Sequence, residues 1–309
     1  MNVAIIGARR VRNGIGEYIA NYFQKNGTPV VCVLGTTEET SSLASRSLKR
    51  YGIEARPYHD FAEMVSREDI QAVAIASPAE SHLDFLKGSL KRGLSVFCEK
   101  PFLDPSRKDL TDELNNIFEQ AWAEGNTVAM NSQWPFCLGA YEELCGSLMP
   151  AGVRRFSIRL SPICSGPAMI PDSVPHALSI LYAVLGPGTI SPPVFSGTDT
   201  DMTIEFTYTS AHGSCAVTIA LIQQSEQPRP FWFGFDDRIA RRSIETARYE
   251  ISFHSGGRRL RVADPLELSV RDFIEACSSG REPLIGRGHI VATTRLLKQI
   301  YDAYSLSRQ

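Results

Sequence analysis

The sequence lacks paired cysteines. Its seven cysteines lie far apart, none of them forms a Cys-x-x-Cys pair, and their number is odd. This pattern fits reduced thiols better than a disulfide framework, and it argues against a structural zinc site. We therefore expect a chain without a metal site, located in the cytoplasm.

An excess of charge of one sign and a long apolar run are missing as well. The 32 lysines and arginines nearly balance the 34 acidic residues, which leaves a formal net charge of -2. Nucleic-acid binding needs a net basic domain or a basic face, so this balance argues against such a partner. The first apolar run, VAIIG from residue 3, is too short for a signal peptide or a membrane helix, and no later window approaches a spanning length. We therefore expect a soluble protein without a membrane partner.

The chain does contain strand and helix patterns, and these change along its length. At 309 residues it is longer than a typical domain, so we expect two domains, 1–125 and 126–309. The first part alternates helical patterns near 16–26, 38–51 and 80–92 with the unbroken apolar runs NVAIIGA, PVVCVLG, AVAIAS and LSVFCE. Such runs predict an α/β domain with a doubly wound parallel sheet that is covered on both faces.

After residue 125 the runs alternate apolar and polar residues, as in DMTIEFTYTS and GSCAVTIAL. This period of two predicts an α+β domain with a large, mainly antiparallel open sheet, and Gly256-Gly257 marks a hairpin. We expect a helix in DSVPHALSILYAVLG with Asp172 as its cap, and two closing helices near 268–279 and 288–305. One face of the sheet needs cover, and a large apolar sheet face commonly marks a subunit interface.

A glycine-containing loop follows the first strand in VAIIGARRVRNGIGEYIANYF. Glycines at such a turn let the backbone approach a pyrophosphate at a helix N-terminus, although a turn that binds nothing is the alternative. The loop is about four residues longer than G-x-G-x-x-G, and Asn13 takes the second glycine's place. The residues expected to contact a dinucleotide here are Gly7, Arg9, Arg10, Asn13, Gly14, Ile15 and Gly16.

The end of the second strand, VLGTTEETSS, indicates which dinucleotide is preferred. Thr36 and Thr37 stand where an NAD-binding domain usually places an acidic residue for the ribose hydroxyl. Small hydroxylated residues and the arginines of the glycine loop suit the 2′-phosphate of NADP. Because Glu38 or Glu39 also lies within reach of the ribose, NAD stays open.

The segment AIASPAESHLDFLKGSLKRGLSVFCEKPF resembles the glucose-fructose oxidoreductase and inositol dehydrogenase (Gfo/Idh/MocA) family, whose members run from IATP or IASP through a helix to EKP. The resemblance implies a Rossmann-type first domain, a cis Lys100–Pro101 peptide bond, and a homodimer or homotetramer that pairs through the C-terminal sheet. Its matching residues, expected at the cofactor, are Ser77, Pro78, His82, Glu99 and Lys100.

The likeness continues in PDSVPHALSILYAVLG. Asp172 and His176 are four residues apart, so both project from one helix face if the helix starts early enough. In the family's sugar and polyol dehydrogenases such a pair joins the EKP lysine, which implies catalytic roles for Lys100, Asp172 and His176; a helix cap and a packing histidine are the alternative. Ser179 stands where the family often has a second carboxylate, which disfavours a sugar substrate.

These features together predict an NAD(P)-dependent oxidoreductase that transfers a hydride between a nicotinamide cofactor and a small hydroxyl or carbonyl compound, such as a sugar, a polyol or a related metabolite. Gln133 and Trp134, in NSQWPF, are expected to contact this substrate. Two alternatives stay open. One is a non-catalytic dinucleotide-binding regulatory protein of the same fold, and the other is an imine or C=C reductase.

Overall fold

The computed structural model of the chain describes residues 1–8 and 14–308. It divides into two compact units, of which the first comprises Met1–Asn131 with Leu266–Ile290 and the second Ser132–Pro265 with Val291–Gln309. The first unit thus runs past residue 125 and includes a segment from the C-terminal third. The division of function between 1–125 and 126–309 stays a prediction.

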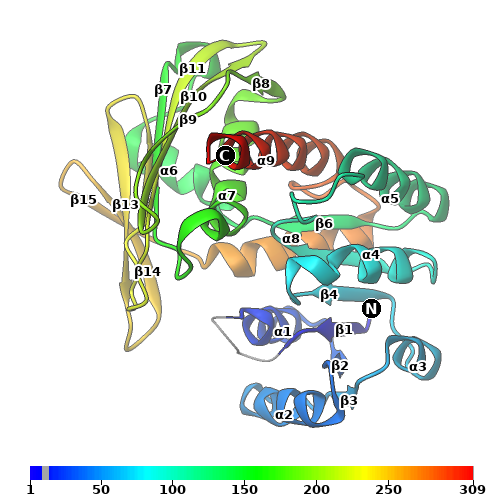
Figure 1. Cartoon of the computed structure of the whole chain (residues 1–309). Coiled ribbons are helices and arrows are strands. Elements are labelled where there is room, and N and C mark those ends of the chain that lie inside the picture. The colour runs from blue at the N-terminus through cyan, green and yellow to red at the C-terminus, as the bar shows by residue number, and fades with distance from the viewer. Residues whose placement is uncertain (9–13, 309) are drawn as a thin grey trace. The chain divides into compact units, whose positions relative to one another are not determined.

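The first unit contains a fully parallel sheet (Figure 1). Its strands are β1 (Val3–Ile6), β2 (Val30–Leu34), β3 (Arg56–Tyr58), β4 (Ala72–Ile75), β5 (Ser95–Glu99) and β6 (Val128–Asn131). They lie in the order β3-β2-β1-β4-β5-β6, and every neighbouring pair is parallel. The order reverses between β1 and β4, which is the doubly wound arrangement that the sequence predicts.

Helices accompany these strands: α1 (Gly16–Lys25), α2 (Glu38–Leu48), α3 (Phe61–Arg67), α4 (His82–Leu90), α5 (Leu110–Glu124) and α8 (Pro265–Ser279). Three aromatic rings explain why α8 belongs to this unit. Phe273 of α8 lies 6.0 Å from Phe23 and 5.5 Å from Phe97 between ring centroids, in tilted or edge-on contacts that favour packing. Beside it, the Met130 amide donates a hydrogen bond of 3.1 Å to the Ile285 carbonyl.

The count of strands in this unit differs from the prediction. The segment Arg56–Tyr58 has only three residues, two of them exposed, and contains a proline, so it has no apolar run. The strand that ends at Glu99 is therefore the fifth of the chain, and not the fourth.

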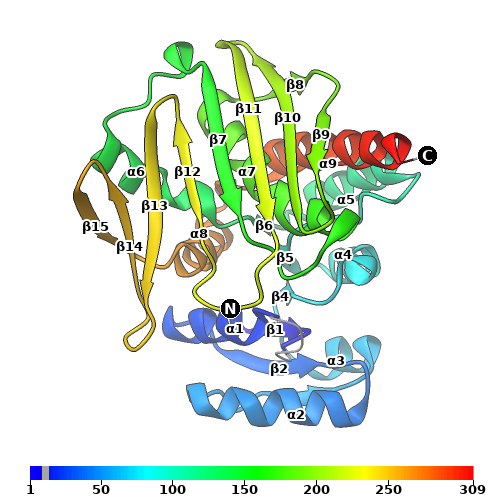
Figure 2. The ribbon, with the colours of Figure 1, turned by 60° about the vertical axis from the view of Figure 1, so that its left-hand side comes forward.

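The second unit contains a large mixed sheet, seen from another side in Figure 2. Its strands are β7 (Arg155–Leu160), β8 (Gly188–Ile190), β9 (Val194–Gly197), β10 (Asp201–Ser210), β11 (Gly213–Ile222), β12 (Trp232–Phe235), β13 (Arg238–Glu245), β14 (Glu250–Ser255) and β15 (Arg258–Val262). The order is β15-β14-β13-β12-β7-β11-β10-β8, with β9 beside β10. Among the described strands of this second sheet only β7 and β11 pair in parallel, so the predicted fold class is confirmed.

The alternating residues of these strands divide as expected between two faces. Met202, Ile204, Phe206 and Tyr208 are buried, whereas the residues between them are more exposed. The hairpin between β14 and β15 turns through Gly256 and Gly257, whose φ angles of 54° and 78° favour glycine. β12 and β13 also escaped prediction: β12, WFGF, is too apolar to alternate, and β13, RIARRSIE, carries arginines at adjacent positions.

The opposite face of the sheet is not the large apolar face that the sequence led us to expect. A row across β10, β11, β7 and β12 consists of Glu205, Thr218, Ser157 and Gly234. Its neighbours are mostly hydroxylated, small or basic, with Trp232 and Ile239 as apolar exceptions. Association of copies through this sheet stays a prediction, and such an interface would be mainly polar.

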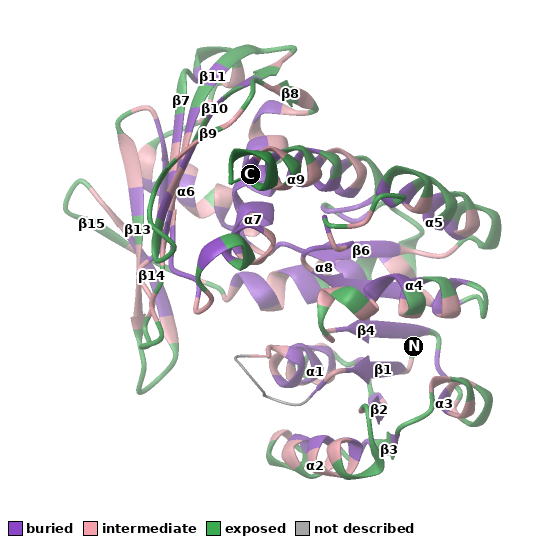
Figure 3. Ribbon diagram, viewed as in Figure 1, coloured by how far each residue is buried: buried purple, intermediate pink, exposed green. Residues whose placement is uncertain are grey.

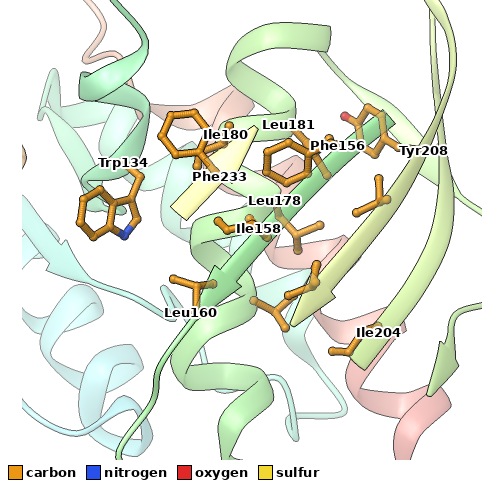
Figure 4. Close-up of a cluster of buried hydrophobic side chains, with 14 of the residues drawn as sticks. Trp134, Phe156, Ile158, Leu160, Leu178, Ile180, Leu181, Ile204, Tyr208 and Phe233 are labelled. Carbon is orange, nitrogen blue, oxygen red and sulfur yellow. The ribbon is translucent and has the colours of Figure 1, made fainter. Parts of the chain in front are cut away.

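The remaining helices are α6 (Leu138–Cys145), α7 (Met169–Leu185) and α9 (Arg287–Ser307). With its preceding turn, α7 forms the segment Gly166–Leu185, which is long and apolar enough to cross a membrane; this corrects the expectation that no window reaches that length. However, 61% of its most apolar window is buried within the fold, and Figure 3 shows much of α7 as buried. Figure 4 shows Leu178, Ile180 and Leu181 among the core side chains of β7, as in a core helix.

Candidate functional site

The carboxyl end of β5 presents the acid-base pair that the sequence analysis selected. Glu99 lies opposite Asn131 of β6 in the strand register, and the Asn131 Nδ2 atom donates to the Glu99 Oε1 atom. The side chain of Lys100 is partly exposed, and the Lys100–Pro101 peptide bond is cis, as the resemblance implies. Glu99 is buried, and the hydrogen bond from Asn131 holds its carboxylate in place. Sequence reasoning missed Asn131.

His82 connects two turns of the first unit. Its Nδ1 atom lies 2.9 Å from the Pro101 carbonyl oxygen, its Nε2 atom lies 2.8 Å from the Ser77 carbonyl oxygen, and the ring is 1% exposed. Burial lowers the pKa of the His82 imidazole, and the two facing carbonyl oxygens act in the opposite direction. A neutral ring has one N–H, so only one carbonyl receives a hydrogen at a time. The geometry suits a residue that holds the turns beside Lys100; direct contact of His82 with a cofactor stays a prediction.

The glycine turn after β1 is tightly packed. Gly7 has a φ of 84°, and a Cβ atom there would lie 2.7 Å from the Ser77 backbone nitrogen; at Gly16 it would lie 2.5 Å from the Gly7 carbonyl oxygen. Only glycine fits such distances without movement of the backbone. Ile15, the N-cap of α1, makes no side-chain hydrogen bond to the helix, whose N-terminal end favours an anion.

The remaining loop residues that were predicted to contact the cofactor are Gly14 and three residues before it. Gly14 lies just before α1 and is partly exposed. The remaining loop residues selected for the cofactor, Arg9, Arg10 and Asn13, lie outside the described residues, as does Arg12.

The end of β2 carries exposed hydroxyl groups. Thr37 is the N-cap of α2: the Thr40 amide donates to its Oγ1 atom at 3.2 Å, and its own amide donates to Thr40 Oγ1 at 2.9 Å. This capping box occupies the Thr37 hydroxyl. Thr36 is exposed beside it, with its Oγ1 atom 3.4 Å from that of Thr40. The choice between NADP and NAD stays a prediction.

In the second unit, α7 begins earlier than the sequence indicates. Its N-cap is Ala168 and its first residue Met169, because the short turn 166–168 leads directly into the helix. Asp172 is therefore not the cap, which corrects the prediction; its Oδ2 atom accepts a hydrogen bond of 2.9 Å from the Ser173 hydroxyl. As both lie within the helix four residues apart, Asp172 and His176 share one face, and both are partly exposed.

Ser132 contacts the imidazole of His176. Its Oγ atom lies 3.2 Å from His176 Nδ1 and 3.4 Å from the Pro175 carbonyl oxygen, and Ser132 is fully buried. When the hydroxyl donates to that carbonyl, it accepts from Nδ1–H, which leaves Nε2 unprotonated and able to accept a proton. Sequence reasoning selected its neighbours Gln133 and Trp134 and missed Ser132, since nothing local links residues 132 and 176.

Ser132→Ala is expected to lower kcat about fivefold and to change KM little, because it removes one hydrogen bond, about 1 kcal/mol, that orients the imidazole. Ser252→Ala is the matched control, since this buried serine of the same unit accepts from Arg259 instead. Steady-state kinetics over a range of pH test the effect. An unchanged kcat and pH profile in Ser132→Ala would exclude this role.

Trp134 packs against the same histidine. Its ring stacks on Phe231 at 3.8 Å and meets His176 edge-on at 6.2 Å between centroids. Because Trp134 is only 4% exposed, most of its surface serves packing, whereas Gln133 is partly exposed. Contact of either residue with a substrate stays a prediction. Among the described residues no cluster of His, Cys, Asp or Glu suits a metal ion.

The parallel sheet, its switch point and the glycine turn give the first unit a doubly wound fold of the Rossmann type. Residues 1–132 match the family model GFO_IDH_MocA, described as "Oxidoreductase family, NAD-binding Rossmann fold". Over these residues the chain is thus similar to the Gfo/Idh/MocA oxidoreductases, the family that its EKP segment resembles.

Curated relatives match a limited part of the chain. Inositol 2-dehydrogenase of Salmonella typhimurium is 30% identical over 90 residues, which cover 28% of this chain and 27% of that protein. The Burkholderia cenocepacia enzyme of the same name is 38% identical over 58 residues, or 19% of this chain and 17% of that protein. The matched segments thus span about a quarter of these relatives or less.

Solved structures extend the likeness of fold to the whole chain. UDP-N-acetylglucosamine 3-dehydrogenase from Acidithiobacillus ferrooxidans has a TM-score of 0.74 at 17% identity, covering 100% of this chain and 99% of that one. A 3-ketoreductase from Actinomadura kijaniata, in complex with NADP, has a TM-score of 0.71 at 15% identity, covering 96% and 95%. At such identities the likeness concerns the fold.

Proposed function

We propose that this protein is an NAD(P)-dependent oxidoreductase, which transfers a hydride between a nicotinamide cofactor and a small hydroxyl or carbonyl compound. The match of residues 1–132 to an NAD-binding oxidoreductase family carries this proposal. The names of the relatives support it: they are dehydrogenases of inositol and of UDP-N-acetylglucosamine, and a ketoreductase.

The residues of the first unit fit a dinucleotide. Gly7 and Gly16 allow the backbone to turn without a side chain in the way, and the first-turn amides of α1 have no side-chain acceptor at the N-cap. In our proposal these amides bind the pyrophosphate, and Thr36 contacts the adenosine ribose or its phosphate. A bound nicotinamide dinucleotide supplies the hydride donor or acceptor.

Lys100, Asp172 and His176 are the residues that we propose to act on the substrate. His176 takes the hydroxyl proton at Nε2 during oxidation and returns it during reduction, with Ser132 holding Nδ1. The Lys100 ammonium group stabilises negative charge that develops on the substrate oxygen. Asp172, one turn before His176 on α7, binds a substrate hydroxyl or orients the imidazole.

The position of Ser179 favours a second candidate function. Ser179 is fully buried in α7, so this position provides no carboxylate for sugar hydroxyls. Reduction of a C=N or C=C bond needs no such carboxylate, and Lys100 and His176 would then act as acids. Oxidation of polyols as the sole activity would argue against this version, and tight NADPH binding without any turnover would favour a regulatory protein.

NADPH is expected to bind at least about tenfold more tightly than NADH, because one charge-assisted hydrogen bond to the 2′-phosphate is worth about 1.5 kcal/mol or more. Fluorescence titration of the full chain with each dinucleotide measures the two Kd values. Thr36→Asp places a carboxylate at the end of β2 and should reverse the preference. Equal affinities, or tighter NADH binding by the unaltered chain, would contradict the expected preference; binding of neither would remove the proposed function.

A further inference from the structure

Two neighbouring arginines of the second unit, Arg229 and Arg242, donate their side-chain hydrogen bonds to backbone carbonyl oxygens. The Arg242 Nη2 atom donates a hydrogen bond of 2.6 Å to the Arg229 carbonyl oxygen, and the Arg229 Nη1 atom donates one of 3.1 Å to the Ser161 carbonyl oxygen. Within the described part of the chain, neither guanidinium forms an ion pair with a carboxylate. Both side chains are half-buried, so bulk water screens their charges only in part.

The strand register places Arg242 beside the aromatic stack at His176. Its backbone amide donates to the Phe231 carbonyl oxygen at 2.9 Å, where β12 begins. The guanidinium carbon lies 5.2 Å from the Trp134 centroid and 5.4 Å from the Phe231 centroid. Because those centroids are only 3.8 Å apart, the guanidinium lies beside the stack and not above one ring. Trp134 thus has Arg242 and the proposed proton-transfer residue His176 as neighbours.

The electrostatics of the pair favour an anion. Burial is the main cause that lowers the pKa of Arg242 to about 10; the charge of Arg229 acts in the same direction, and Tyr249, Cys137 and Asp264 act against it. The side chain is nevertheless a cation at neutral pH. Two like charges in a half-buried place destabilise the fold unless an opposite charge joins them.

We propose that Arg242, assisted by Arg229, binds an anionic group of the substrate, either a carboxylate or a phosphate. An arginine has five N–H donors in a planar fork, and Arg242 makes a single side-chain hydrogen bond to the described residues. The free edge of the fork suits a bidentate contact with two anionic oxygens. This assignment rests on the proposed function. Ser179 supplies no carboxylate for substrate hydroxyls; in our proposal the positive charge of Arg242 selects an anionic substrate instead.

Anion titration followed by the fluorescence of Trp134 tests the proposal. The chain has three tryptophans, so Trp122→Phe with Trp232→Phe leaves Trp134 as the only emitter. Sodium acetate and sodium phosphate at constant ionic strength are the probes. We expect a saturable change in emission with at least one of them, and a dissociation constant at least about tenfold higher in Arg242→Met, which keeps an apolar side chain of similar reach. A response to phosphate alone identifies a phosphate-bearing substrate, and a response to acetate alone a carboxylate.

Two further variants keep the result interpretable. Arg155→Met, which removes an arginine paired with Asp237, should leave the titration unchanged, and Arg229→Met should weaken it if Arg242→Met does not fold. Absence of any saturable response, or an equal response in the folded Arg242 and Arg229 variants, would overturn the proposal. The readout needs no cofactor, so its failure is distinguishable from failure of NADPH binding.

Discussion

His176→Ala is expected to lower kcat by about 10²- to 10⁴-fold, since a positioned general acid or base contributes that much to a proton-coupled hydride transfer. The affinity for NADPH should stay the same, because in our proposal His176 acts on the substrate, whereas the glycine turn binds the dinucleotide. Lys100→Ala is expected to cost about 10²-fold or more, through lost stabilisation of charge on the substrate oxygen.

Steady-state turnover, with dinucleotide titration of each variant, measures these effects. His254→Ala is the matched control: this histidine of the same unit bonds the Ser243 hydroxyl at 2.6 Å on the outer face of the sheet, and its removal should leave kcat unchanged. Unchanged rates in both His176→Ala and Lys100→Ala would remove the proposed site.

Gly7→Ala is expected to destabilise the protein by about 3 kcal/mol or more and to abolish dinucleotide binding. A left-handed backbone conformation costs a residue with a Cβ atom about 1–2 kcal/mol. At Gly7, with a φ of 84°, the new atom also meets the Ser77 nitrogen at 2.7 Å, a backbone atom that has no rotamer by which to move away. The turn after β1 would therefore have to move away from the turn after β4.

Gly27→Ala separates the two contributions. Gly27 has a similar φ of 75°, but a Cβ atom there meets nothing within 4 Å, so only the conformational cost of about 1–2 kcal/mol remains. Urea denaturation of both variants gives the two free energies of unfolding. Equal losses of stability would show that the close approach at Gly7 has no energetic consequence.

The sequence predicts those parts of the fold whose burial is regular. The unbroken runs of β1 and β4 are buried at every position, and the alternation of β10 matches its buried face, so both sheets follow from periodicity. β3 escaped because its three residues at the sheet edge, of which only Tyr58 is buried, are too few to carry a pattern.

The candidate site divides in the same way. Local spacing reveals Gly7, Gly16 and the Asp172–His176 pair, since each depends on neighbours in the chain. Ser132 and Asn131 were missed, because their partners are 44 and 32 residues away and the contacts arise only from the folded arrangement. Asp172 was misassigned as a cap because the helical turn before it, 169–171, contains a proline that reads as a boundary.

Loss of the near-ultraviolet absorbance of NADPH, followed with a panel of small carbonyl and imine compounds, tests the central claim most directly. The panel should include compounds with a carboxylate or a phosphate group. We expect at least one of them to drive NADPH oxidation by the unaltered protein, and His176→Ala to remove most of that rate while still binding NADPH. Tight NADPH binding without oxidation by any compound, or a rate that persists in His176→Ala, would contradict the account.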